Sequence, residues 1–146
     1  MYSKINEIKK ITKNKNFNIS IFKIFDTHII DFIEDFSLEL KKKIKLMPTA
    51  EINYLINWTK RESVLKAYEN YKSFNEFRSG RGLIFHVCPN NVPTNFIFSF
   101  FLGLLSGNSN VVKLPSSNFP EKKFLLSIIN KLWNKKKYIK IKNSNC

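Results

Sequence analysis

The chain has 146 residues, of which 43% are hydrophobic, and it carries a formal net charge of +14. That apolar share excludes a disordered chain, and the length suits one domain with a buried core. No segment reaches the ~18 apolar residues of a membrane span, and the start lacks the apolar region of a secretion signal, so a cytoplasmic protein is predicted. The cysteines, Cys88 and Cys146, provide neither a disulfide framework nor metal-ligand spacing, and no metal site is predicted.

The positive charge has two interpretations. A basic chain can bind nucleic acid or an anionic surface, and the same field would attract an anionic ligand such as coenzyme A or a phosphorylated dinucleotide. The lysines spread over the whole chain, however, among many Asn, Ile and Phe residues. That dispersal favours a compositional bias over a dedicated nucleic-acid face.

The first predicted helix follows a polar, lysine-rich lead-in over residues 1–23. Asp26 or Thr27 can cap this helix, because short polar side chains accept hydrogen bonds from the first backbone N–H groups. Apolar residues then recur at helical spacing and predict one buried face. They are Ile29, Ile33, Phe36, Leu40 and Ile44.

A second amphipathic helix is predicted over about residues 50–71, separated from the first by Pro48 and Thr49. Its predicted buried face contains Ile52, Leu55, Ile56, Leu65 and Tyr68. Trp58 is interpreted as a packing residue. A polar connection over residues 73–81 leads into the next element.

Residues 82–117 contain the pattern of strand, turn, buried helix, strand and loop. Leu83–Val87 is a short run of β-forming residues, and Pro89 ends it. Pro93 suits the first turn of a helix, where its missing N–H costs nothing. Phe96–Leu105 is apolar on nearly every side, which is typical of a helix that is buried on both faces.

A second strand, Val111–Leu114, follows Gly107, which is placed to end the helix in a left-handed cap. A strand–helix–strand unit of this length predicts a parallel pair with a right-handed crossover. Ligands bind at the carboxyl ends of such strands. The loops predicted there, residues 89–93 and 115–118, are both polar.

A third helix is predicted over residues 118–135 and a third strand over residues 138–142. The predicted apolar stripe of this helix contains Phe124, Leu125, Ile128, Ile129 and Leu132. The fold class is therefore α/β, with N-terminal helices followed by a β-α-β-α-β half of a dinucleotide-binding domain. We divide the chain into a helical region, 1–78, and a partial dinucleotide-binding domain, 79–146.

Three motifs carry a resemblance: PNNVP at 89–93, GLLSGN at 103–108 and VVKLPS at 111–116. They resemble the cofactor-domain core of the aldehyde dehydrogenase superfamily, and within it the long-chain acyl-CoA reductases of the bacterial luminescence type. Residues 48–71 resemble the helix before this core in the same branch, so the resemblance covers roughly 48–132. It implies a Rossmann-like fold and the NADPH-dependent reduction of a fatty acyl-CoA thioester to an aldehyde.

The resemblance implies a catalytic role for Asn91, which matches the turn asparagine of the family's oxyanion hole. A tetrahedral oxyanion needs preorganised, neutral N–H donors, and an amide held by a proline-flanked turn supplies one. The alternative role for Asn91 is that of a helix cap.

The resemblance also implies a cofactor site at Lys113, Pro115, Ser116 and Ser117, the family's strand exit. Lys113 lies one residue earlier than the family's ribose-binding lysine, and such a shift moves a side chain to the other face of a strand. A solvated strand lysine is the alternative. Ser117 replaces a carboxylate and does not repel a 2′-phosphate, which favours NADPH. Ser116 and Ser117 can alternatively cap the next helix.

The family's chemistry also needs a cysteine nucleophile, which neither Cys88 nor Cys146 matches. Cys88 is interpreted as a core residue, His86 as a packed or hydrogen-bonded core histidine and His28 as a surface residue. We therefore predict the N-terminal part of an acyl-CoA reductase, truncated and inactive alone, with a companion polypeptide that completes the domain. The alternatives are a basic nucleic-acid-binding module and a non-catalytic protein that docks through an open sheet edge.

Overall fold

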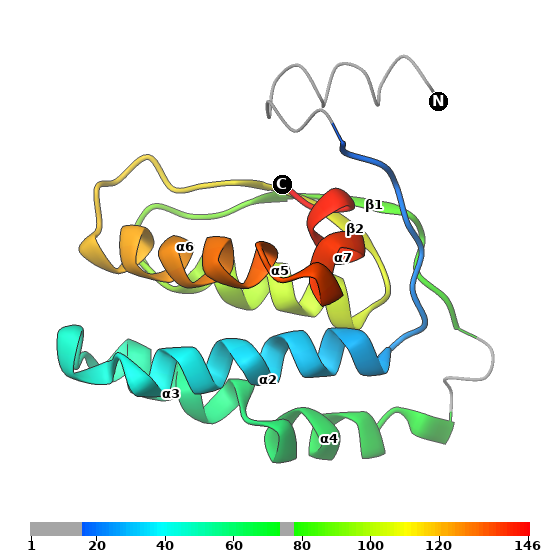
Figure 1. The fold of residues 1–146 in the computed structure, drawn as a ribbon, viewed down its shortest axis with the longest axis horizontal. Helices are drawn as coiled ribbons and strands as arrows, with labels where there is room; N and C mark the ends of the chain where they lie inside the picture. Colours follow the sequence, from blue (N-terminus) through cyan, green and yellow to red (C-terminus); the bar gives the residue numbers. More distant parts are fainter. Residues whose placement is uncertain (1–15, 74–77) are drawn as a thin grey trace.

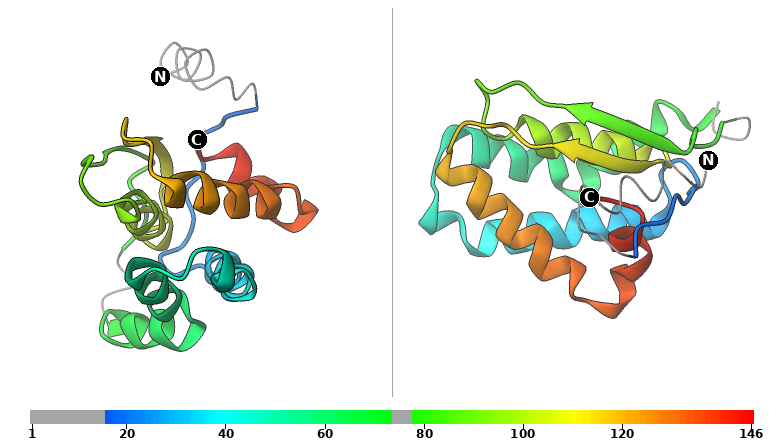
Figure 2. Two further views of the ribbon diagram at one scale, coloured as in Figure 1. Left: turned by 90° about the vertical axis from the view of Figure 1, so that its left-hand side faces the viewer. Right: turned by 90° about the horizontal axis from the view of Figure 1, so that it is seen from above.

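The computed structural model describes residues 16–73 and 78–146, which form three layers (Figures 1 and 2). Two parallel strands form the first layer, α5 and α6 lie beneath them, and α2, α3 and α4 form the base. The elements are α2 (Thr27–Lys42), η1 (Ile44–Leu46), α3 (Ala50–Thr59), α4 (Arg61–Glu69), β1 (Leu83–Val87), α5 (Asn95–Leu105), β2 (Ser109–Lys113), α6 (Pro120–Trp133), η3 (Lys136–Tyr138) and α7 (Ile139–Asn143).

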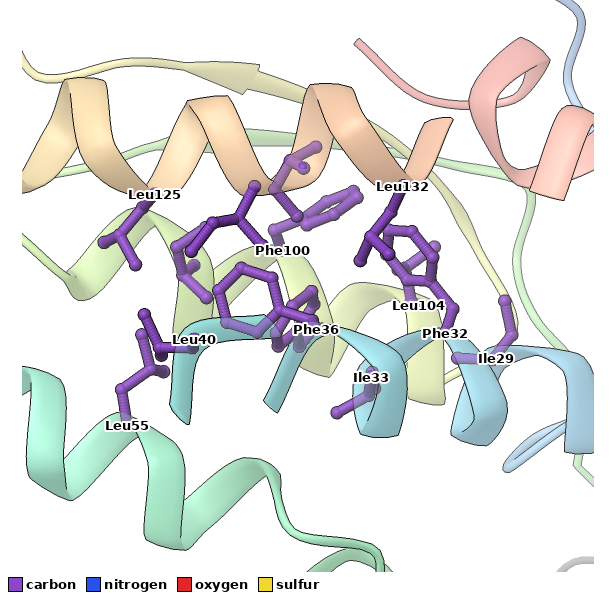
Figure 3. Close-up of a cluster of buried hydrophobic side chains, with 14 of the residues drawn as sticks. Ile29, Phe32, Ile33, Phe36, Leu40, Leu55, Phe100, Leu104, Leu125 and Leu132 are labelled. Atoms are coloured by element: carbon purple, nitrogen blue, oxygen red, sulfur yellow. The ribbon is translucent and has the colours of Figure 1, made fainter. Parts of the chain in front are cut away.

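Helix α2 confirms the first predicted helix. The Asp26 carboxylate accepts a hydrogen bond from the backbone N–H of His28 and so caps the helix. The predicted face is fully buried from Ile29 to Leu40, while Ile44 belongs to η1 and is half-buried. Figure 3 shows this face packed against side chains of α3, α5 and α6, which together form the core.

The second predicted helix is interrupted, which corrects its predicted buried face. Lys60 has extended backbone angles (φ −59°, ψ 142°) and separates α3 from α4. After this break, Arg61 donates to the carboxylates of Asp31 and Glu34 on α2, at 2.8 and 2.7 Å. Because the break shifts the helical phase, Val64 is buried, and the predicted Leu65 is 39% exposed.

The strands confirm the predicted parallel pair, with Leu83 opposite Ser109 and Val87 opposite Lys113. β2 begins two residues before its predicted start. Gly107 has a φ of +78° and donates its N–H to the Leu104 carbonyl, as predicted for a left-handed cap. The α/β class is thus confirmed.

The predicted third strand at 138–142 is wrong, because η3 and α7 occupy these residues. The Tyr138 ring is buried, and its hydroxyl donates to the Asp31 carbonyl (3.0 Å) and to the Asp35 carboxylate (2.9 Å). Burial raises the pKa of Asp35, but hydrogen bonds from Lys135, Lys137 and Tyr138 outweigh it and lower this pKa to about 2. These contacts with α2 hold the segment in a helical conformation.

Among the described residues the sheet therefore has two strands, and the predicted β-α-β-α-β half of a Rossmann-like domain is not seen. The chain instead reaches the free edge of β2 after α7, where Asn145 forms an isolated parallel bridge with Asn110. The prediction of a strand at 138–142 failed because periodicity alone does not distinguish an apolar strand from a short helix.

Candidate functional site

The loops that follow β1 and β2 meet at the carboxyl end of the sheet, and we call residues 89–93 and 113–118 the carboxyl-end loop pair. The Asn90 side-chain oxygen accepts a hydrogen bond from the Ser116 N–H at 2.9 Å. The Asn90 carbonyl accepts one from the Ser117 hydroxyl at 3.1 Å. Asn90 therefore joins two loops that are 26 residues apart in the sequence.

Lys122 of α6 holds the second loop from the other side. Its ammonium group donates to the carbonyls of Pro115 (2.8 Å) and Ser117 (2.6 Å). The N-cap of α6 is Phe119, with no side-chain cap bond, so the alternative role of Ser116 and Ser117 as caps is wrong. The loop is fixed by Lys122 and by Asn90.

Asn91 lies in the turn after β1, and its side chain is exposed. Helix α5 begins at Asn95 with Thr94 as its N-cap, so the alternative role of Asn91 as a helix cap is wrong. Pro93 precedes the helix instead of lying in its first turn. The Asn91 amide is thus accessible to a ligand at the carboxyl end of the sheet.

Lys113 ends β2 opposite Val87, and both side chains are exposed. Val112 and Leu114 line a cavity above α5 and α6, so alternation places Lys113 on the opposite face of the strand. Lys113 therefore does not share a face with Leu114, the residue at the family's lysine position. Pro115 is buried and Ser116 is exposed.

A partly buried hydrogen-bonded chain leads from His86, near the end of β1, to Asn110 at the start of β2. Asn110 Oδ1 is only an acceptor, so His86 Nε2 donates to it at 2.8 Å. His86 Nδ1 then accepts from the Ser99 hydroxyl of α5 at 2.7 Å. Asn110 Nδ2 donates to the Asn108 carbonyl and to Asn145 Oδ1. His86 is a hydrogen-bonded histidine, as predicted.

Sequence reasoning did not find the partners of His86. Asn108 belongs to the GLLSGN motif and Asn110 directly precedes the VVKLPS motif, and both lie at the opposite end of the strands from the predicted ligand loops. A signal was present, because polar side chains two residues apart at the start of a buried strand need hydrogen-bond partners.

Cys88 does not have the surroundings of an activated nucleophile. Cys88 is half-buried against the core, and burial raises the pKa of its thiol. A raised pKa lowers the thiolate fraction, and the thiolate is the reactive form. The backbone of Cys146 pairs with β2. In 16–73 and 78–146, no group of three or more His, Cys, Asp or Glu residues could hold a metal ion.

The charge around the loop pair fits an anionic ligand. No acidic residue occurs between Glu76 and Glu121, a segment that includes both strands and both loops. Lys113, Ser116 and Ser117 offer one cation and two hydroxyl groups, which are groups that bind phosphate.

No helix in the described part of the chain has the length and apolar character to cross a membrane.

A comparison with protein families found a match. The family model described as acyl-CoA reductase (LuxC) matches residues 2–141. Searches of curated proteins and of solved structures found no match. The matched range extends well beyond residues 48–132, where the resemblance was recognised.

Proposed function

The chain belongs to the acyl-CoA reductase (LuxC) family, and from this premise we propose that its carboxyl-end loop pair serves the NADPH-dependent reduction of a fatty acyl-CoA thioester to an aldehyde. One observation carries the proposal. Asn90 bonds the two loops together and leaves the neighbouring Asn91 amide exposed at the same end of the sheet. A rigid turn with an accessible neutral donor is what stabilisation of an oxyanion requires.

Asn91 would donate its side-chain N–H to the thioester carbonyl oxygen as that oxygen gains negative charge. A donor that is held in place before the reaction needs no reorganisation, and the loss of one such donor typically costs about 100–1000-fold in rate. The Asn90–Ser116 bond and the Lys122 contacts would keep the turn in place.

The cofactor would be held by Lys113, Pro115, Ser116 and Ser117. When bound, NADPH supplies the hydride for the reduction. Ser117 has no charge to repel a 2′-phosphate, and the nearest carboxylates in the sequence are those of Glu76 and Glu121. We propose that this neutral position selects NADPH over NADH.

The cysteine nucleophile would come from neither Cys88 nor Cys146. The burial of the Cys88 thiol, which raises its pKa, supports this assignment for Cys88. We therefore propose that the 146-residue chain binds cofactor and substrate but does not turn over alone. The family match does not favour the nucleic-acid-binding alternative.

The first test titrates NADPH and NADH with the whole chain and uses the fluorescence of the nucleotide to measure binding. We expect tighter binding of NADPH, and we expect Ser117→Glu to weaken it by about tenfold, because the new carboxylate repels the 2′-phosphate. Ser127→Glu, at an exposed serine of α6, is the matched control. Equal binding of both nucleotides, or equal effects of the two variants, would refute the assigned cofactor site.

The second test incubates the chain with NADPH and dodecanoyl-CoA and measures dodecanal. Aldehyde formed by the chain alone would show that the assignment of inactivity is wrong. Any turnover, from the chain alone or from a mixture that complements it, should fall about 100–1000-fold in Asn91→Ala. A smaller fall in turnover would show that Asn91 does not act as a donor in the oxyanion hole.

A further inference from the structure

Lys122 of α6 directs its ammonium group at the loop that follows β2. An ammonium group has three N–H donors. Two of them bond to the carbonyls of Pro115 and Ser117, at 2.8 and 2.6 Å. Among the residues that the structure describes, the third donor has no partner, and Lys122 forms no ion pair. A positive charge is therefore fixed on this loop with one N–H left for a ligand.

This charge lies beside the residue to which the proposed cofactor site assigns the 2′-phosphate. The Ser117 hydroxyl already donates its one hydrogen to the Asn90 carbonyl at 3.1 Å. A phosphate oxygen accepts hydrogen bonds, so this hydroxyl cannot donate to it while that bond is in place. The neutral Ser117 side chain thus tolerates a phosphate without attracting it. The attraction needs a charged donor nearby, and Lys122 bonds to the carbonyl of the same residue.

The other lysines near this loop are less suited to the task. In the structure, the exposed Lys113 side chain makes no hydrogen bond or ion pair with any described residue. An anion that binds Lys113 must therefore first order a long flexible side chain, which costs conformational entropy. Lys123 is exposed, and neighbouring residues of a helix do not face each other. Lys122 alone among these three is held in place by the loop.

We propose that Lys122 is a specificity-determining residue of the cofactor site, and that its third N–H pairs with the 2′-phosphate of NADPH. The inference rests on the proposed function, because it assumes that the loop binds a nicotinamide dinucleotide. A charge-assisted hydrogen bond is roughly twice as strong as a neutral one. NADH has a hydroxyl group in place of this phosphate and gains no such bond. Ser117 then permits the phosphate, and Lys122 selects for it.

The test measures the affinities of NADPH and NADH for the whole chain and for Lys122→Gln by nucleotide fluorescence. Glutamine keeps N–H groups that can bond to a loop carbonyl, but it has no charge. We expect about a tenfold loss of NADPH affinity and little change for NADH. Loss of the loop contacts alone would weaken both nucleotides equally. Lys123→Gln removes the same charge from the exposed neighbouring residue and should leave the ratio of the two affinities unchanged.

A second measurement follows the 2′-phosphate itself by ³¹P NMR. The second pKa of a phosphate monoester is about 6, and a neighbouring ammonium group lowers it. The 2′-phosphate of bound NADPH should therefore titrate at lower pH than that of free NADPH, and Lys122→Gln should abolish the difference. Lys113→Gln should preserve it. If circular dichroism shows that Lys122→Gln does not fold, Lys113→Gln decides, because loss of the difference there would assign the pairing to Lys113 and overturn the role of Lys122.

The affinities also separate this inference from the proposed function. If the wild-type chain binds NADPH no more tightly than NADH, the proposed cofactor selection and the role of Lys122 are both overturned. If the wild-type chain prefers NADPH and Lys122→Gln keeps that preference, only the role of Lys122 is overturned. A preference that is lost in Lys122→Gln and kept in Lys123→Gln supports both.

Discussion

Asparagine side chains lie at both ends of the β1–β2 pair, but they are buried at the amino end and exposed at the carboxyl end. At the amino end, Asn108 and Asn110 are 4% and 0% exposed. Backbone groups bond to the Asn108 side-chain amide, and a backbone carbonyl and two side chains bond to that of Asn110. At the carboxyl end, Asn90 and Asn91 are exposed, and Asn91 is left accessible. Burial, more than residue identity, therefore separates a structural asparagine from a candidate catalytic one.

The amino end connects elements that are distant in the sequence. Asn108 Oδ1 accepts from the N–H groups of Arg81 (2.6 Å) and Gly82 (3.1 Å), and its amide donates to the Ser106 carbonyl (3.0 Å). This one side chain ties the start of β1 to the end of α5. Since each of these groups would lose a partner if it were removed, the amino end should determine stability.

The carboxyl end has fewer constraints. Its contacts join one loop to the other through Asn90, and one loop to α6 through Lys122. Exposed groups can bond to water when a partner is lost, so their contribution to folding is small. The carboxyl end should therefore determine ligand binding and rate, and three substitutions test this division.

Asn110→Ala should have the largest effect on stability, a loss of about 3 kcal/mol in the free energy of unfolding, because it leaves several buried groups without partners. The groups affected are His86 Nε2, the Asn108 carbonyl and Asn145 Oδ1. Urea denaturation, monitored by circular dichroism, measures this loss in the free energy of unfolding. Asn91→Ala is the matched control and should cost less than about 0.5 kcal/mol, as exposed substitutions usually do. Similar losses in the two variants would show that the buried amino end does not contribute more to stability than the exposed carboxyl end.

Gly103→Ala should cost about 2 kcal/mol, because a Cβ at this position would lie 1.9 Å from Asn110 Oδ1 and 3.0 Å from His86 Nε2. The side chains must move apart, which weakens the His86–Asn110 bond. The ring nitrogens of His86 should shift in ¹⁵N NMR spectra, and the unfolding midpoint should fall. Leu102→Ala, at the exposed neighbouring position, should change neither. Normal His86 spectra in Gly103→Ala would show that the glycine is not needed for this contact.

Much of the fold followed from local patterns. The apolar spacing of α2 and α6 and the Gly107 turn that ends α5 depend on neighbours within a few positions, so the sequence revealed them. The segment 138–142 was misassigned because the bonds of Tyr138 reach α2, more than 100 residues away. The break at Lys60 was missed because apolar residues continue on both sides of it.

The candidate site was predictable to a similar extent. Parallel pairing alone placed the loops after β1 and β2 at one end of the sheet. The bond from Ser116 to Asn90 and the contacts of Lys122 were not predictable, because no local pattern marks a side chain that bonds to the backbone of another loop. The resemblance drew attention to Asn91, while the structure shows which neighbour holds its turn.

Of the three test substitutions, Asn90→Ala should have the smallest effect on stability, about 0.5–1 kcal/mol, because it removes one exposed hydrogen bond and leaves the backbone contact with Ser117. Its effect should appear in local order instead. The Ser116 amide, which loses its acceptor, should exchange faster with solvent while the amides of β2 stay protected. Asn53→Ala removes a comparable exposed bond within α3 and is the control. If Ser116 exchange does not change, the Asn90 side chain does not hold the loops together, and the preorganisation assigned to the Asn91 turn must come from the bond between the Ser117 hydroxyl and the Asn90 carbonyl.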